Sequence, residues 1–144
     1  MTTLINIKSD IRDYSVEIID DSLKFIHKEL IIGSFFIIDE NIFRIYFKNS
    51  IFEKFPNNFL IIQPNEVNKS IDKCKSIIER LVEKNIRHNQ KLVAIGGGIT
   101  QDITAFIASI YLRGVDWIFF PTTLLAQADS CIGGKTSINL NDIK

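Results

Sequence analysis

Apolar residues gather in short runs along the chain, and six of these runs are typical of β-strands. They are rich in Ile, Phe and Val, and several are apolar without interruption, which is the pattern of parallel strands buried on both faces. The expected strands are Thr3 to Lys8, Tyr14 to Ile19, Ser34 to Ile38, Asn58 to Gln63, Lys91 to Ile95 and Asp116 to Phe120.

Helical periodicity separates the later strands. The clearest helical pattern runs from Ser70 to Asn85, where the apolar positions share one face and Ser70 is placed to cap the N-terminus. Further helical patterns cover Asp21 to Leu30, Ile42 to Phe55 (one helix or two short turns) and the segment that carries Ile103, Phe106, Ile107 and Ile110. Alternating strands and helices predict one α/β domain, a Rossmann-like parallel sheet flanked by helices.

Composition changes this picture little. Hydrophobic residues make up 46% of the 144 positions and charged residues 24%, as in ordinary globular domains. Lys plus Arg and Asp plus Glu number 17 each, so no net field favours nucleic acid or an anionic membrane. Any anion must therefore be bound by local groups.

Cysteine, histidine and the N-terminus exclude some kinds of site. Cys74 and Cys131 form neither a metal-ligand spacing nor a disulfide framework, and His27 and His88 have no partner that suggests a metal site or a catalytic dyad. The first residues lack the features of a signal peptide, and no apolar run has the length of a membrane span. We therefore expect a cytoplasmic protein with neither membrane nor nucleic acid as a partner, and no metal ligand in this chain.

A glycine turn is the first candidate binding device. Gly96, Gly97 and Gly98 directly follow the expected strand 91–95 and precede a helix. Glycine allows a close approach of ligand to backbone, and the amides and dipole of a helix N-terminus favour an anion. Taken alone, the same glycines also suit an ordinary turn between a strand and a helix.

Further motifs follow this turn in a specific order. They are Asp102, Arg113-Gly114, Pro121 to Leu125, and Asp129-Ser130-Cys131-Ile132-Gly133-Gly134-Lys135-Thr136. From Gly96 to Lys144 the chain resembles the dehydroquinate synthases, within the wider sugar-phosphate cyclase family. Two looser matches lie upstream, at Asp39-Glu40-Asn41 and at Glu66 to Lys69. Gln101 and Cys131 depart from the family pattern, which commonly has glycine and serine there, so Gln101 would narrow the pocket or add a hydrogen bond.

The resemblance implies an NAD site. The residues that it assigns to this cofactor are Asp39, Asn41, Glu66, Lys69, Gly97, Gly98, Ile99, Thr100, Gln101, Asp102, Thr122, Thr123, Lys135 and Lys144. Several have simpler alternatives. Asp39 and Asn41 also suit an Asp/Asn turn, Glu66 and Lys69 a charge pair, and Asp102 and a threonine helix caps.

Three charged residues are the candidate catalytic groups. Lys135 follows two glycines and suits a phosphate or carboxylate contact, and Asp129 lies in a stretch where a buried carboxylate would need a partner. Arg113 completes the set. A surface loop is the alternative for Asp129, and a stabilising cation at a helix C-terminus is the alternative for Arg113.

The activity implied by the resemblance is that of 3-dehydroquinate synthase, which converts 3-deoxy-arabino-heptulosonate 7-phosphate to 3-dehydroquinate and phosphate in the shikimate pathway. It implies NAD, a divalent metal (zinc or cobalt) and a homodimer at full length. Residues 1–144 would form the NAD-binding domain, inactive alone, with the metal ligands in a helical C-terminal domain. The alternatives are another sugar-phosphate cyclase, of inosose or valiolone type, and a non-catalytic nucleotide-binding remnant.

Overall fold

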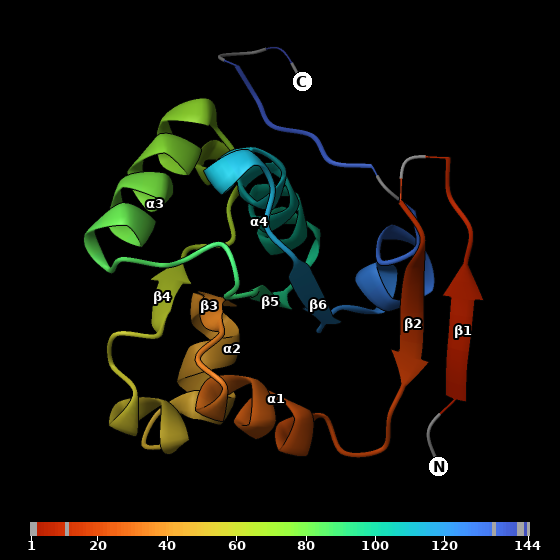
Figure 1. Cartoon of the computed structure of the whole chain (residues 1–144), viewed down its shortest axis with the longest axis horizontal. Helices are drawn as coiled ribbons and strands as arrows, with labels where there is room; N and C mark the ends of the chain where they lie inside the picture. The colour runs from red at the N-terminus through yellow and green to blue at the C-terminus, as the bar shows by residue number, and fades with distance from the viewer. Residues whose placement is uncertain (1–2, 11, 134, 141–142, 144) are drawn as a thin grey trace.

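A four-stranded parallel sheet forms the centre of the computed structural model, which describes residues 3–10, 12–133, 135–140 and 143. Its strands are β3 (Phe35–Asp39), β4 (Phe59–Ile62), β5 (Leu92–Gly96) and β6 (Trp117–Pro121), in the order β4-β3-β5-β6. In register, Phe36 of β3 lies opposite Phe59 on one side and Val93 on the other. The predicted α/β fold with a Rossmann-like parallel sheet is confirmed (Figure 1).

Helices cover both faces of this sheet. One face packs against α3 (Ile71–Glu83) and α4 (Gly98–Ile110), and the other against α1 (Ser22–Ile31) and the short helices α2 (Glu40–Ile42), η1 (Phe43–Phe47) and η2 (Ile51–Lys54). Alternate residues of β3 therefore belong to different cores: Phe35 and Ile37 to the first, Phe36 and Ile38 to the second. This double burial explains why the strand sequences are continuously apolar.

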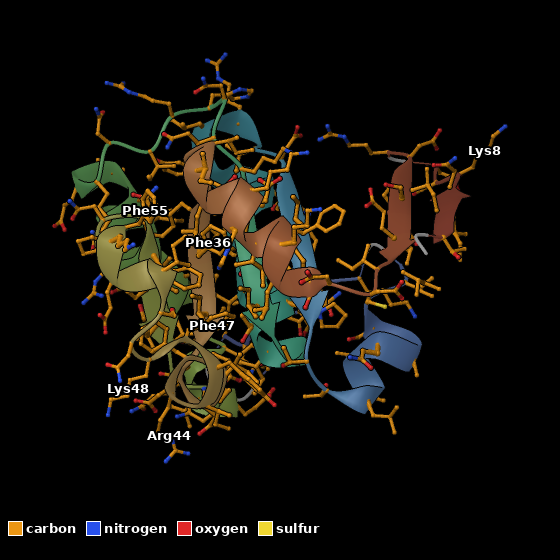
Figure 2. The ribbon with its side chains drawn as sticks, turned by 90° about the horizontal axis from the view of Figure 1, so that it is seen from below. Lys8, Phe36, Arg44, Phe47, Lys48 and Phe55 are labelled. Atoms are coloured by element: carbon orange, nitrogen blue, oxygen red, sulfur yellow. The ribbon has the colours of Figure 1, made fainter. Side chains whose placement is uncertain are left out.

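An aromatic cluster fills the second core. The Phe52 ring meets the rings of Phe36 and Phe47 edge to face, with centroids 5.2 Å and 5.0 Å apart, and Phe43 stacks on Phe59 at 5.2 Å. In Figure 2 the labelled Phe36 and Phe47 lie among the elements that form this core, while the side chains of Arg44 and Lys48 extend away from it. The segment from Ile42 to Phe55, predicted as one helix or two short turns, forms the two short helices η1 and η2.

The first two strands are separate from the central sheet. β1 (Thr3–Ile7) and β2 (Tyr14–Ile18) pair only with each other in the described residues, antiparallel, with Ile5 opposite Val16. The segment 8–13 that joins them is too short for the crossover that parallel neighbours require. An ion pair between Arg12 and Asp116, 2.8 Å long, links the hairpin to the residue before β6. Both strands were predicted, but their place outside the sheet was not.

Local signals explain the helix boundaries. The Ser70 hydroxyl accepts a hydrogen bond from the Lys73 amide at 3.3 Å, as predicted for the cap of α3. Inside α3, Cys74 is 1% exposed, and burial raises the pKa of its thiol to about 11, so it remains a neutral thiol in the core. Within the described segments, no helix has the length and apolarity that a membrane crossing needs.

Candidate functional site

Most of the predicted site residues lie at one edge of the sheet. Because the strands are parallel, their carboxyl ends meet, and the segments that follow β3, β4, β5 and β6 begin there. Asp39 ends β3, Gly97 follows β5, and Thr122 follows β6, with its amide donating to the Gly96 carbonyl at 2.9 Å. The short helix η3 (Glu66–Asn68) follows β4 at the same edge.

Each glycine of the triplet has a different role. A Cβ on Gly96 would lie 2.5 Å from the Thr100 hydroxyl oxygen, and a Cβ on Gly97 would lie 3.1 Å from the Thr123 methyl carbon. Gly98 begins α4, and the nearest atom to a Cβ there would be the Ser130 hydroxyl oxygen at 4.0 Å. Gly96 and Gly97 therefore permit close packing, whereas Gly98 leaves open space at the helix N-terminus.

The N-terminus of α4 is suited to an anion. Gly97 occupies the capping position, and no side chain of the described residues makes a capping hydrogen bond there. The first amides of a helix lack partners within the helix and carry the positive end of its dipole. Gly97, Gly98 and Ile99 thus present backbone donors toward the edge of the sheet where the other site residues gather.

Asp39 already has a structural task. It is 7% exposed, and its Oδ1 accepts hydrogen bonds from the amides of Asn41 (2.8 Å) and Ile42 (3.3 Å), which caps α2. Asn41 is exposed, and its Oδ1 accepts from the Arg44 guanidinium at 3.5 Å. The turn alternative is therefore realised, and a ribose would have to use the second carboxylate oxygen of Asp39.

A charge cluster joins two segments that are far apart in the sequence. Lys69 Nζ lies 2.8 Å from Asp102 Oδ2 and 3.7 Å from Glu66 Oε1, and its side chain is only 12% exposed. Burial lowers the pKa of Lys69, but the hydrogen bond and charge of Asp102, with the charge of Glu66, outweigh it and raise the pKa above 10.5. The predicted Glu66–Lys69 pair is present, and Asp102 pairs with Lys69 instead of capping its own helix.

The C-terminal segment holds this cluster from outside. The Asn139 side-chain amide donates to Glu66 Oε1 at 3.1 Å, and its backbone amide donates to the Lys69 carbonyl at 2.8 Å. Asn139 was not among the predicted site residues. Its signal in the sequence was weak, because it lies beyond the motif that ends at Thr136.

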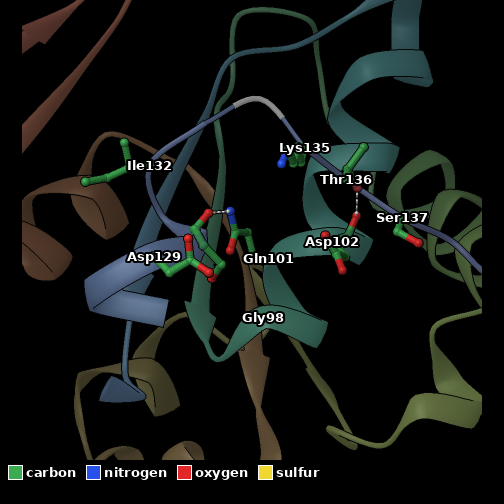
Figure 3. Close-up of a pocket in the computed structure, with 9 residues that line it drawn as sticks. Gly98, Gln101, Asp102, Asp129, Ile132, Lys135, Thr136 and Ser137 are labelled. Atoms are coloured by element: carbon green, nitrogen blue, oxygen red, sulfur yellow. Dashed lines mark hydrogen bonds between the residues drawn. The ribbon is translucent and has the colours of Figure 1, made fainter. Parts of the chain in front are cut away.

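A cavity of about 630 Å³ adjoins the N-terminus of α4 (Figure 3). It collects four of the predicted charged or polar residues, Gln101, Asp102, Asp129 and Lys135, from segments that are separate in the sequence. Its lining residues are Gly98, Gln101, Asp102, Asp129, Ser130, Ile132, Lys135, Thr136 and Ser137. The Thr136 hydroxyl donates to the Asp102 carbonyl at 2.8 Å, which anchors the segment that carries Lys135 against α4. The volume suits a small-molecule ligand.

Gln101 and the short helix η5 (Ala126–Ser130) form one wall of this cavity. The Gln101 side chain is buried, and its Nε2 donates to the Ser130 carbonyl at 2.5 Å. Figure 3 shows Gln101 between Asp129 and Asp102. Ser130, Ile132, Thr136 and Ser137 were not predicted as site residues, although three of them lie within the motif from which Asp129 and Lys135 were chosen.

Other predicted residues lie outside the cavity lining. Thr123 accepts a hydrogen bond from the Ala126 amide at 3.2 Å, which is the predicted capping role, and Thr100 is fully buried. Arg113 lies in η4 (Tyr111–Arg113), beyond the C-terminal end of α4, exposed and with φ of 71°. Lys144 lies outside the described residues.

Comparison with known proteins decides the family. The family model described as 3-dehydroquinate synthase N-terminal matches residues 59–144, which is more than half of the chain. The chain belongs to this family. Among 3-dehydroquinate synthases, that of Alkaliphilus oremlandii (strain OhILAs) is 44% identical over 113 residues, which cover 76% of this chain and 31% of the relative. That of Streptococcus equi subsp. equi (strain 4047) is 30% identical over 151 residues, covering 99% and 41%.

A solved sugar-phosphate cyclase shares the fold. The crystal structure of 2-deoxy-scyllo-inosose synthase complexed with carbaglucose-6-phosphate, NAD+ and Co2+ superposes with a TM-score of 0.78 at 23% identity, covering 96% of this chain and 40% of that one. The chain thus spans less than half the length of its dehydroquinate synthase relatives and of this cyclase. The resemblance to the dehydroquinate synthases is confirmed.

Proposed function

We propose that residues 1–144 form the NAD-binding domain of a 3-dehydroquinate synthase, which converts 3-deoxy-arabino-heptulosonate 7-phosphate to 3-dehydroquinate and phosphate in the shikimate pathway. The observation that carries the proposal is the cavity beside the uncapped N-terminus of α4. It unites Asp102, Asp129 and Lys135 with the open space at Gly98. A site for a dinucleotide and an anionic sugar requires these kinds of group next to one another.

The described residues fit NAD. The backbone amides at Gly97, Gly98 and Ile99 would hold the pyrophosphate, because no side chain in the described part of the chain caps the helix N-terminus and no Cβ fills the space at Gly98. At the adenosine end, Asp39 and Asn41 would bind the ribose through groups not used in capping α2. When bound, NAD accepts a hydride from the substrate and returns it within the same turnover.

The remaining cofactor residues would act around this core. Asp102, fixed by Lys69 at 2.8 Å, would orient the nicotinamide half, with Glu66 completing the charge cluster. Further contacts with NAD would come from the residues after the glycine triplet, after β6 and in the C-terminal segment. They are Thr100, Gln101, Thr122, Thr123, Lys135 and Lys144. The 2-deoxy-scyllo-inosose synthase that shares this fold is complexed with NAD+, which supports the proposal.

Lys135 and Asp129 would meet the sugar phosphate. Both are exposed residues of the cavity lining, so they would contact substrate at its rim. Lys135 would donate to a phosphate or carboxylate oxygen, and Asp129 would accept from a substrate hydroxyl. Arg113 lies beyond the C-terminal end of α4, away from this cavity. It would contact a substrate only if another domain, or the second subunit of the proposed homodimer, placed that substrate beside it.

A divalent metal, zinc or cobalt, is proposed only for the full-length enzyme. The described residues contain no group of three or more His, Cys, Asp or Glu side chains that could hold a metal ion. We therefore propose that its ligands lie outside this chain, in the helical domain. A cytoplasmic location belongs to the same proposal.

A second candidate is an inosose-forming cyclase. The fold of 2-deoxy-scyllo-inosose synthase matches 96% of this chain, and Gln101 occupies the cavity wall at a position where dehydroquinate synthases commonly have glycine. Activity assays with the substrate of each candidate enzyme distinguish the two. The full-length gene product, supplied with NAD and zinc, should release phosphate from 3-deoxy-arabino-heptulosonate 7-phosphate and form 3-dehydroquinate. Phosphate release from glucose 6-phosphate instead would establish the second candidate.

A further inference from the structure

Two polar atoms of residues that line the cavity have no hydrogen-bond partner among the described residues. They are Gln101 Oε1 and Ser130 Oγ, and both atoms are buried. Gln101 is 3% exposed, and it lies in the first turns of α4, a helix of 13 residues. Buried polar atoms in proteins nearly always have a partner, so two such atoms in one cavity indicate a missing partner.

The orientation of the Gln101 amide is set by its neighbour. Nε2 donates to the Ser130 carbonyl oxygen at 2.5 Å. The reversed amide would bring two oxygen acceptors together, so the carbonyl of Gln101 must be the group left over. The same hydrogen bond holds the Ser130 backbone in place beside Gln101, and the Ser130 hydroxyl is on this same residue.

We propose that Gln101 Oε1 and Ser130 Oγ form a hydrogen-bonding subsite for a neutral ligand group that carries an O–H or N–H donor. The ligand's donor would bind Gln101 Oε1, and the Ser130 hydroxyl would either donate to or accept from the same group. This inference rests on the proposed function, in which two ligands carry such a group. A sugar ring offers a hydroxyl, and the nicotinamide half of NAD offers a carboxamide.

Charge and space at the cavity favour a neutral group at this position. A Cβ on Gly98 would still be 4.0 Å from Ser130 Oγ, so the glycine leaves room beside the hydroxyl. The carboxylate of Asp102 is neutralised by Lys69 at 2.8 Å. Asp129 and Lys135 are exposed, which leaves the charged parts of a ligand to the rim and its neutral part to the buried wall.

Ser130→Ala in the full-length gene product is the sharper test, because the Ser130 hydroxyl has no partner to lose among the described residues. Its melting temperature should equal or exceed that of the parent, since removing an unpartnered buried hydroxyl is not destabilising. Gln101→Met removes the amide at similar length and should melt at a lower temperature, because the Ser130 carbonyl loses its donor. Each variant should weaken the binding of one ligand by about fivefold to tenfold.

The two ligands are measured separately, NAD by its Kd in calorimetry and the sugar phosphate by its KM. A rise confined to KM assigns the subsite to a sugar hydroxyl, and a rise confined to the NAD Kd assigns it to the carboxamide. Thr104→Val is the matched control. The Thr104 hydroxyl is also buried and unpartnered in the described structure, but it does not line the cavity, so neither constant should change.

The inference and the proposed function fail differently. Parental values of both constants in Ser130→Ala and Gln101→Met would overturn the subsite and leave the proposed function intact. Equal weakening by Thr104→Val would also overturn it, because the effect would then belong to helix packing. A parent protein that binds no NAD and turns over no sugar phosphate would refute the proposed function and the subsite with it.

Discussion

Gly98→Val separates binding from folding at the N-terminus of α4. A Cβ at this position would meet nothing closer than the Ser130 hydroxyl oxygen at 4.0 Å, and Gly98 is not among the described residues with positive φ. The substitution therefore introduces neither a clash at Cβ nor backbone strain. Valine is a better helix former than glycine, so the free energy of unfolding should stay within about 0.5 kcal/mol of the parent value.

NAD binding should respond very differently. The branched side chain would occupy the space through which the pyrophosphate approaches the first amides of α4. Hydrogen bonds to a charged group contribute about 1.5–3 kcal/mol each, so losing one of them weakens binding by about tenfold to a hundredfold, and losing two by up to about ten-thousandfold. The predicted variant is therefore folded but poor in NAD binding.

The assay pairs urea denaturation with calorimetric NAD titration of the same preparation. Gly96→Ala is the matched control, because its new Cβ would lie 2.5 Å from the Thr100 hydroxyl oxygen and 3.0 Å from the Asp39 Cβ. It should lower the free energy of unfolding by about 1–3 kcal/mol through overpacking. If Gly98→Val keeps both parental stability and parental NAD affinity, the glycine triplet is only a turn and the reasoning fails.

Four further predictions concern charge and completeness. Lys135→Ala in the full-length gene product should lower turnover by about two to three decades, corresponding to about 2–4 kcal/mol, and should weaken NAD binding much less; near-normal kcat would return Lys135 to the solvated surface. The 144-residue chain alone, given NAD and zinc, should release no phosphate from the heptulosonate phosphate, and measurable release would contradict the domain proposal. NAD should bind more tightly than NADP, because the Asp39 carboxylate would repel a 2′-phosphate; equal Kd values in parallel titrations would exclude this role. Lys69→Met should lower the free energy of unfolding by about 1–2 kcal/mol, because it leaves Asp102 without its partner at 2.8 Å. A double-mutant cycle with Asp102→Asn should show coupling between the two residues, whereas additive losses would mean that the ion pair contributes nothing.

The motifs of the glycine turn and beyond were sufficient to recognise the family. Gly96 to Gly98, Pro121 to Leu125 and Asp129 to Thr136 are local sequences with a specific order, and the match over residues 59–144 confirms what they indicated. Strand and helix positions were also predictable, because doubly buried parallel strands and amphipathic helices leave clear hydrophobic periods. The roles of the individual site residues stay predictions.

The position of the first hairpin was decided by tertiary structure. The residues of β1 and β2 read as strands, yet Leu4 is 55% exposed and Ile18 is 58% exposed in the described structure. Strand propensity is a property of local sequence, whereas membership in a sheet depends on which edges come within hydrogen-bonding distance. Because the connection between β1 and β2 is too short for a parallel crossover, these two strands pair with each other as an antiparallel hairpin.

Only the tertiary structure decided which side chains meet. Lys69 and Asp102 are brought together because β4 and β5 both end at the same edge of the sheet, and Gln101 meets Ser130 because β6 returns the chain to that edge. Arg113 is close to these residues in sequence, but α4 separates it from the cavity by its 13 residues, about 20 Å at 1.5 Å per residue. Periodicity and motif spacing describe each segment by itself, and the parallel sheet fixes the distances between their ends.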